Sequence, residues 1–234
     1  MVSGDRLTLH AETLWCSPYS FSSWVALHEK GLPFDVVEVS LLELRHWEPA
    51  YRDRSITAKI PALTHGDFWV AESSAIAEYL EDAFPDRPRL FPSDPKVRAR
   101  ARQLMAWMRS DLGALRDERP TVSMFYERAR RPLSSNGAAA AASLLRVTEL
   151  VLPAGTTSLF GAWTLADSEL AFMLHRLLLN GHDVPARIRA FAEAQWARPS
   201  VQSFVRHARP ATLPPAYWTL PWNVSSAAAP GGAG

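Results

Sequence analysis

Strand-like and helix-like patterns alternate at the start of the chain. Residues 7–10 alternate between apolar and polar side chains, and residues 34–39 are rich in valine and phenylalanine, which are both patterns typical of strands. Between them, residues 21–30 place apolar side chains at helical spacing, and Gly31 follows as a stop signal. The pattern therefore predicts a strand, a helix and a second strand.

The next segment predicts a hairpin and a helix. Residues 41–58 are polar and irregular, with at most a short helix near residues 42–47. Two apolar runs, residues 61–64 and 68–70, flank a His-Gly-Asp turn, and residues 73–84 carry one apolar helical face. The order βαβ followed by αββα predicts a small α/β domain, and the late hairpin indicates a mixed sheet.

A proline-rich stretch, residues 85–95, separates this domain from a purely helical pattern. We expect helices at 97–118, 138–152, 165–180, 186–196 and 201–207. The expected division is an α/β domain at 5–86, a linker at 87–95, a helical domain at 96–208 and a flexible tail at 209–234. The aromatic residues of that tail could still dock on the body, and the sequence leaves this open.

The composition limits the classes of binding partner that we expect. Hydrophobic residues make up 47% of the chain, and 25 Lys and Arg nearly balance 24 Asp and Glu, so we expect neither nucleic acid nor an anionic membrane as partner. Cys16 is the one cysteine, which excludes an internal disulfide and a cysteine-rich metal site. No signal peptide and no apolar run of about 20 residues is present, so we expect a cytoplasmic protein without a bound metal.

Two short motifs offer backbone groups to a ligand. Ile60-Pro61 precedes a predicted strand, and a cis bond there would turn the Ile60 N–H and C=O toward an extended peptide; the alternative is a trans proline at a strand edge. Glu72-Ser73 stands where a strand gives way to a helix. The helix start would hold a carboxylate and Glu72 an ammonium group, whereas the alternative is a plain cap by Ser73 or Ser74.

A third motif, Ser17-Pro18-Tyr19-Ser20, lies between the first strand and the first helix. It resembles the Cys-Pro-Tyr-Cys turn of thioredoxins and glutaredoxins with both thiols replaced by hydroxyls, although a plain turn capped by Ser20 or Ser22 is the alternative. Together with the segments around Ile60-Pro61 and Glu72-Ser73, the chain resembles soluble, serine-type bacterial glutathione S-transferases. Thr164 and Asp167 agree, since they match that family's capping box at a buried helix start.

The resemblance implies a thioredoxin-like domain followed by a helical bundle, and it implies a role for each residue that matches the family motifs. Ser17 would hydrogen-bond the glutathione sulfur, Ile60 would pair with the cysteinyl unit, and Pro61 would be cis. Glu72 and Ser73 would hold the γ-glutamyl amino and carboxylate groups. The residues implied near the glycine carboxylate are His46 and Lys59, with a solvated His46 as the alternative.

The implied function is a glutathione transferase that activates the glutathione thiolate against small hydrophobic electrophiles, in detoxification or oxidative stress, as a homodimer. The alternatives are a glutathione-dependent peroxidase or disulfide reductase, and a non-catalytic binding or regulatory protein on the same scaffold. Cys16 precedes the serine and is expected to be a small buried hydrophobe, with a mixed-disulfide role as the alternative. The candidates for the electrophile pocket are Trp15, Trp107, Met108, Asp111 and Met124, most of which helical spacing assigns to the core.

Overall fold

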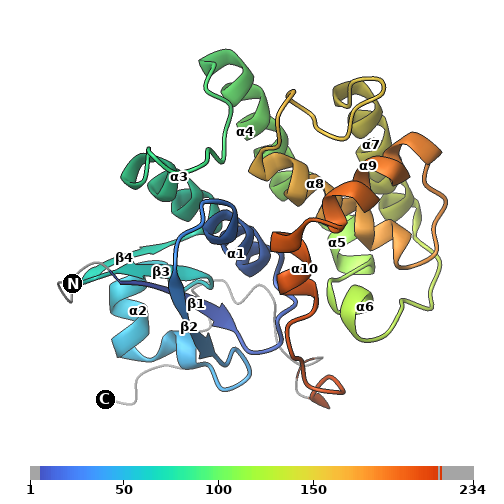
Figure 1. Cartoon of the computed structure of the whole chain (residues 1–234). Coiled ribbons are helices and arrows are strands. Elements are labelled where there is room, and N and C mark those ends of the chain that lie inside the picture. The colour runs from blue at the N-terminus through green and yellow to red at the C-terminus, as the bar shows by residue number, and fades with distance from the viewer. Residues whose placement is uncertain (1–5, 216, 218–234) are drawn as a thin grey trace.

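The structure is a computed structural model that describes residues 6–215 and 217. Figure 1 shows a sheet with helices at one end of the molecule and a group of helices at the other. The first region contains β1 (Leu7–Glu12), α1 (Pro18–Glu29), β2 (Phe34–Val39), the short 3₁₀ helix η1 (Arg45–Trp47), α2 (Pro49–Ser55), β3 (Ala62–His65), β4 (Phe68–Ala71) and α3 (Ser73–Ala83). The strand order is β2-β1-β3-β4, with β1 parallel to β2 and the other two pairs antiparallel.

The sheet is covered on both faces. Leu9 and Leu63 belong to a large core cluster shared with α1 and α3, whereas Ala62 packs with Tyr51 of α2 in a smaller cluster. Figure 1 shows α2 on the opposite side of the sheet from α1 and α3. Side chains of a strand point alternately to the two faces, which explains why neighbours such as Ala62 and Leu63 enter different clusters.

The second region is helical: α4 (Pro95–Ser110), α5 (Gly113–Glu118), α6 (Val122–Phe125), α7 (Ser135–Val151), α8 (Leu165–Leu178), α9 (Ala186–Trp196) and α10 (Pro199–Val205). The large core cluster runs without a break from α1 into α8 and α10. Glu29 of α1 binds Arg198 across this boundary, with Nη2 and Oε2 2.8 Å apart. The predicted fold class, a thioredoxin-like mixed sheet followed by a helical domain, is confirmed.

Several predicted elements differ in their bounds. The helix expected over 97–118 is two helices, because α4 ends at Ser110 and α5 begins at Gly113. The segment expected to be irregular holds α2, whose first residue, Pro49, has the φ angle that the start of a helix needs. The predicted capping box is confirmed: the backbone N–H of Thr164 donates to Oδ2 of Asp167 across 2.7 Å, and Thr164 accepts in return.

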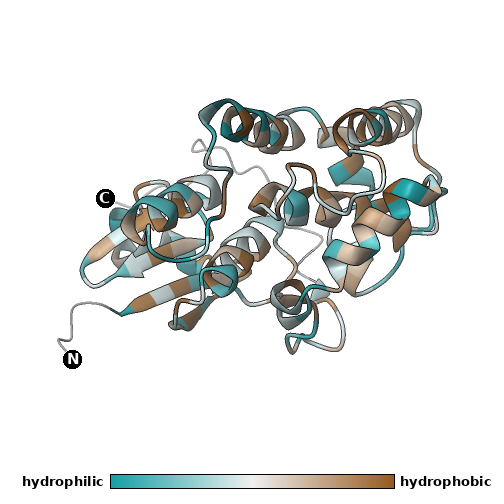
Figure 2. Cartoon of the chain, turned by 45° about the horizontal axis from the view of Figure 1, so that its top comes forward, coloured by the Kyte–Doolittle hydropathy of each residue, from teal (hydrophilic) through white to brown (hydrophobic). Residues whose placement is uncertain are grey.

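The segment predicted as a flexible tail begins at residue 209, and part of it lies within the described residues. Tyr217 is 5% exposed and packs with Leu14, Cys16 and Val122. The chain therefore docks on the body as far as Tyr217, while the rest of the predicted tail lies outside the described residues. Figure 2 shows hydrophobic and hydrophilic positions mixed along the helices, and in residues 6–215 and 217 no helix is both long and apolar enough to cross a membrane.

Candidate functional site

The turn between β1 and α1 presents a hydroxyl at a helix N-terminus. Ser17 is the N-cap of α1, and its Oγ accepts hydrogen bonds from the N–H groups of Tyr19 at 3.3 Å and Ser20 at 3.2 Å. Its hydroxyl proton has no acceptor in the part of the chain that the structure describes. Two accepted bonds and the positive end of α1 leave this hydroxyl as a donor for an anion in front of it.

A buried carboxylate beneath the turn holds its backbone. Glu12, at the end of β1, is 3% exposed and accepts from the N–H groups of Leu14 at 2.6 Å, Cys16 at 2.6 Å and Ser17 at 2.8 Å. Burial raises the pKa of Glu12, while the hydrogen bonds from these N–H groups act in the opposite direction. No sequence motif predicts this role of Glu12, because its carboxylate serves only backbone groups.

Two residues from the helical region hold the same turn from outside. Arg209 donates to the carbonyl of Trp15 through Nε at 2.9 Å and Nη2 at 2.7 Å, and the hydroxyl of Tyr126 donates to the carbonyl of Leu14 at 3.0 Å. Trp15 has a φ of 49°, in the left-handed region that a bulky residue rarely adopts. The turn before Ser17 is therefore fixed by three separate parts of the chain.

The Ile60-Pro61 bond is cis, as predicted. Neither the N–H nor the C=O of Ile60 has a hydrogen-bond partner among the described residues. Ala62, two residues on, pairs with His10 of β1 on one side and with Ala71 of β4 on the other. Because both pairings are antiparallel, the start of β3 lies at the same sheet edge as the ends of β1 and β4.

Glu72 and Ser73 follow β4 at that edge. Glu72 has a φ of 68°, and α3 begins directly after it at Ser73, with no side-chain cap. The alternative that Ser73 or Ser74 caps the helix is therefore wrong: the positive φ of Glu72 turns the chain straight from strand into helix, which makes Ser73 the first helical residue. The first N–H groups of α3 stay available to an anion, and the exposed Glu72 carboxylate lies beside them.

The structure also brings His46 and Lys59 within electrostatic reach of each other. His46 lies in η1, and burial together with the Lys59 charge lowers the pKa of its imidazole. The hydroxyl of Tyr51 in α2 donates to the carbonyl of Lys59 at 2.7 Å and so ties α2 to the residue before Ile60. Lys59 gives this side of the edge a positive charge, beside which the lowered pKa keeps the His46 imidazole neutral at pH 7.

Cys16 points away from the edge. Its side chain is 6% exposed and packs with Leu14, Val122 and Tyr217. Burial raises the pKa of the Cys16 thiol well above its ordinary value, and the charge of Glu12 adds to the shift. This burial confirms the expectation that Cys16 is a small buried hydrophobe. A buried and protonated thiol is also a poor nucleophile.

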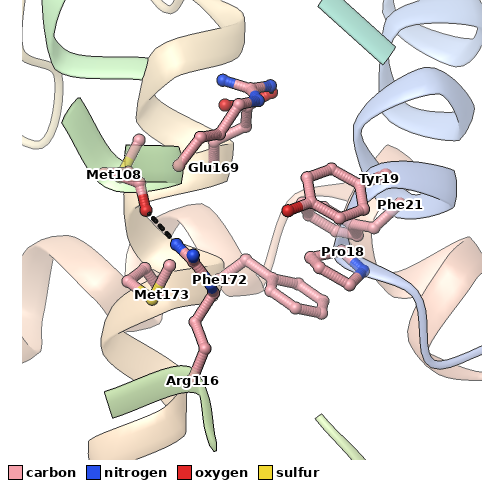
Figure 3. Close-up of a pocket in the computed structure, with 9 residues that line it drawn as sticks. Pro18, Tyr19, Phe21, Met108, Arg116, Glu169, Phe172 and Met173 are labelled. Carbon is pink, nitrogen blue, oxygen red and sulfur yellow. Dashed lines mark hydrogen bonds and ion pairs between the residues drawn. The ribbon is translucent and has the colours of Figure 1, made fainter. Parts of the chain in front are cut away.

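A cavity that is open to solvent adjoins the Ser17 turn. Figure 3 shows Tyr19 on one side with its hydroxyl turned toward the helical region, and Met108, Arg116 and Met173 on the other. The lining residues come from α1, α4, α5 and α8: Pro18, Tyr19, Phe21, Met108, Arg109, Arg116, Glu169, Phe172 and Met173.

Of the five candidates from the sequence, Met108 lines this cavity. Trp15 is fully buried, stacks on His207 at 3.6 Å between ring centroids, and lies in the core. Arg109 and Glu169 form an ion pair across 2.7 Å, and Glu169 also accepts from Ser22 of α1 at 2.6 Å. Mostly apolar walls with a few polar groups are typical of sites for small molecules.

Comparisons with known proteins agree with this arrangement. Residues 16–83 match the family model "Glutathione S-transferase, N-terminal domain", and residues 94–209 match "Glutathione S-transferase, C-terminal domain". A glutathione transferase homologue from Burkholderia, whose crystal structure contains bound glutathione, is 36% identical with a TM-score of 0.71. The alignment covers 86% of this chain and 96% of that one.

More distant relatives match in part or in fold. Glutathione S-transferase U13 of Arabidopsis thaliana is 35% identical over 88 residues, which span 38% of this chain and 39% of that protein, so less than half of the curated relative is matched. A Tau class glutathione S-transferase from mango, Mangifera indica, is 20% identical with a TM-score of 0.69 and 87% and 94% coverage of the two chains, which shows a common fold.

Proposed function

Because the chain belongs to the glutathione S-transferase family, we propose that it is a glutathione transferase, a serine-type member that activates the glutathione thiolate through Ser17. One observation carries the proposal. Three groups of residues far apart in sequence, around Ser17, Ile60 and Glu72, meet at one sheet edge and present groups without protein partners. A plain structural turn, strand start and helix cap would have no reason to coincide there.

These groups match the chemistry of glutathione part by part. The free N–H and C=O of Ile60 would pair with the cysteinyl unit as an added strand. The α3 N-terminus at Ser73 would hold the γ-glutamyl carboxylate, and Glu72 would accept from its ammonium group. His46 and Lys59 would face the glycine carboxylate. The bound glutathione in the Burkholderia homologue supports this assignment for a chain 36% identical.

The mechanism rests on the thiolate. A thiol with a pKa near about 8.5 is only a few per cent ionised at neutral pH, and the thiolate is the nucleophile. Ser17 keeps its proton and donates it as a hydrogen bond to the sulfur, while the α1 N-terminus favours the negative charge. Lowering the thiol pKa by about two units corresponds to roughly 2.7 kcal/mol of differential binding and raises the thiolate fraction more than tenfold.

The thiolate then attacks the electrophile held in the cavity beside Tyr19. With an aryl halide, the sulfur donates its electron pair to form a carbon–sulfur bond, and the halide leaves with the electron pair of the carbon–halogen bond. The positions of Pro18 and Tyr19, which follow Ser17 and line the cavity, support this transfer. The buried Cys16 gives no support to a disulfide reductase that uses its own thiol.

We also infer a homodimer and a cytoplasmic location. On β4, the aromatic ring of Phe68 is 49% exposed at the outer strand of the sheet, and such a side chain favours burial against a second subunit. Light scattering of the purified protein tests the dimer, and Phe68→Ser should shift it toward monomer. An unchanged dimer in the variant would place the interface elsewhere.

The proposed function has a direct test. The purified protein is passed over immobilised glutathione, and kinetics with an aryl halide and with an organic hydroperoxide are compared for wild type and Ser17→Ala. Retention on the column and glutathione-dependent conjugation are expected. Absence of glutathione binding would overturn the proposal, and dominant hydroperoxide turnover would replace transferase by peroxidase.

A further inference from the structure

Two arginines, one lining the cavity and one buried near it, have no acidic partner among the residues that the structure describes. Arg116 lines the cavity, and its Nη1 donates to the carbonyl of Met108 across 2.7 Å, as Figure 3 shows. Arg176 lies one helical turn beyond Phe172 and Met173 on α8; it is 2% exposed, its Nη1 donates to the carbonyl of Arg119 at 2.6 Å, and its Nε has no partner. Neither guanidinium forms an ion pair within residues 6–215 and 217.

The two positive charges act on each other. Burial, together with the charge of Arg116, lowers the pKa of Arg176 to about 10, which places the two groups within electrostatic reach. The neighbouring groups that raise the pKa of Arg176 are the side chains of Tyr19, Cys16 and Tyr217. These are two phenols and a thiol, not carboxylates. A buried charge without a counter-charge is costly, so an anion entering this region would be stabilised.

The other charges of the cavity cancel. Arg109 is paired with Glu169 at 2.7 Å, and Glu169 is the carboxylate of the lining. The remaining charge on the lining is that of Arg116, surrounded by Met108, Phe172 and Met173. The cavity therefore combines apolar walls, which suit a flat organic molecule, with the positive charge of Arg116. The positive charge of Arg176 lies nearby.

We propose that the cavity takes an electrophile that carries a carboxylate, which pairs with the guanidinium of Arg116 while Arg176 behind it adds to the positive potential. The inference rests on the proposed function and names its acceptor class. The apolar lining holds the carbon skeleton, and the carboxylate directs the reactive carbon toward the sulfur site beside Ser17. A carboxylate fits because a guanidinium binds it through two parallel N–H donors.

The test uses a matched pair of aryl halides, 4-chloro-3,5-dinitrobenzoate and its methyl ester. Both have the same leaving group, and each enzymatic rate is divided by the uncatalysed rate with glutathione. We expect the wild type to prefer the carboxylate about tenfold in kcat/KM, mainly through KM, with a preference that weakens as salt is raised. Equal kcat/KM values for the two compounds would overturn the proposal.

Variants assign the preference to the arginine. Arg116→Gln should remove the preference by raising KM for the carboxylate about tenfold while leaving the ester within twofold. Arg189→Gln, on the exposed side of α9, removes the same charge away from the cavity and should change neither substrate. An equal loss for acid and ester in Arg116→Gln would mean a packing role and contradict the proposal.

Arg176 is buried, so its substitution is checked by thermal unfolding first. Arg176→Lys keeps the charge and should retain the preference, and a folded Arg176→Met should lose part of it. If Arg176→Met does not fold, affinity for the carboxylate-bearing conjugate, measured by calorimetry in Arg116→Gln and wild type, decides the question: equal affinities contradict the proposal. Failure of the proposed function would look different, because neither acid nor ester would be turned over and glutathione would not bind.

Discussion

The carboxylate of Glu12 accepts a hydrogen bond from the backbone N–H of Ser17 across 2.8 Å, so the end of β1 directly holds the residue that begins α1. Two further N–H groups of the turn, those of Leu14 and Cys16, bind the same carboxylate. The position of the Ser17 hydroxyl thus depends on a side chain that is itself buried, with 3% exposure.

Substituting Glu12 should therefore impair both stability and rate. Glu12→Ala leaves three N–H groups, two of them buried, without an acceptor and should lower the free energy of unfolding by about 3 kcal/mol or more, measured by urea denaturation. Glu12→Gln keeps one acceptor oxygen and should fold, with a larger loss in kcat than in KM for glutathione. A Glu12→Gln enzyme with wild-type kcat would contradict the positioning role.

Removing the Ser17 hydroxyl should change the pH dependence of the reaction. Ser17→Ala loses a hydrogen bond to an anion, worth about 1.5–3 kcal/mol, so kcat/KM at pH 6.5 should fall by roughly 10- to 100-fold. The apparent pKa of the rate profile should rise toward that of a free thiol. Ser17→Thr keeps a hydroxyl and should retain most of the rate, and the exposed Ser74→Ala serves as control. Identical profiles for wild type and Ser17→Ala would remove Ser17 from the mechanism.

Glu72 offers a test in which stability and binding change in opposite directions. Its φ of 68° is unfavourable for any residue with a Cβ, and glycine adopts it freely. Glu72→Gly should raise the free energy of unfolding by up to about 1 kcal/mol and, at the same time, raise KM for glutathione at least tenfold. Thermal unfolding and steady-state kinetics measure the two effects. An unchanged KM would show that Glu72 does not hold the ammonium group.

The thiol of Cys16 should be unreactive in the folded protein. Because burial raises the pKa of its thiol and the side chain is 6% exposed, iodoacetamide should label it slowly in the native protein and fully after unfolding. Mass spectrometry after turnover should find no glutathione attached to Cys16, and Cys16→Ala should remain active. Rapid native labelling, or inactivity of a folded Cys16→Ala, would favour the mixed-disulfide alternative.

A buried histidine should make stability depend on pH. The Nδ1–H of His175 donates to the Ala171 carbonyl across 2.8 Å, the ring stacks on Trp196, and burial lowers the pKa of the imidazole to about 4. Between pH 6.5 and 4 the unfolded chain binds a proton that the folded chain does not, so the free energy of unfolding falls as the pH falls, by about 3 kcal/mol from this group. His175→Gln should flatten that slope. His10, with a pKa also lowered to about 4, contributes a similar slope, and an unaltered slope in His175→Gln would exclude this origin.

Sequence patterns predict what is encoded locally in this protein. The box between Thr164 and Asp167 and the cis bond before Pro61 depend on neighbours in sequence; both were expected from short motifs that resemble a known family, whereas the local pattern alone left the Pro61 bond open between cis and trans. The alternative of a cap by Ser73 or Ser74 is wrong, and sequence alone suggested it because serine is a good N-cap in general and the unusual φ of Glu72 leaves no trace in the sequence.

Contacts between distant segments stayed hidden for a different reason. The hydrogen bonds from Arg209 to Trp15 and from Tyr126 to Leu14 can be predicted only when the position of the helical region against the sheet is known. An arginine or tyrosine in a helix-rich segment has many possible partners. That Arg116 and Arg176 form no ion pair within residues 6–215 and 217 is likewise a property of the packed structure, since acidic residues are abundant in the sequence.

The hydrogen bonds from Arg209 to the carbonyl of Trp15 also constrain the order in which parts of the protein form during synthesis. The two residues are 194 positions apart, so at a synthesis rate of about 5–20 residues per second the turn leaves the ribosome roughly 10–40 s before its partner does. During that interval the sheet can form around β1, but the loop that precedes Ser17 still lacks its hydrogen bonds from Arg209. The nascent protein can thus form its sheet before the loop that precedes Ser17 is held in its final position.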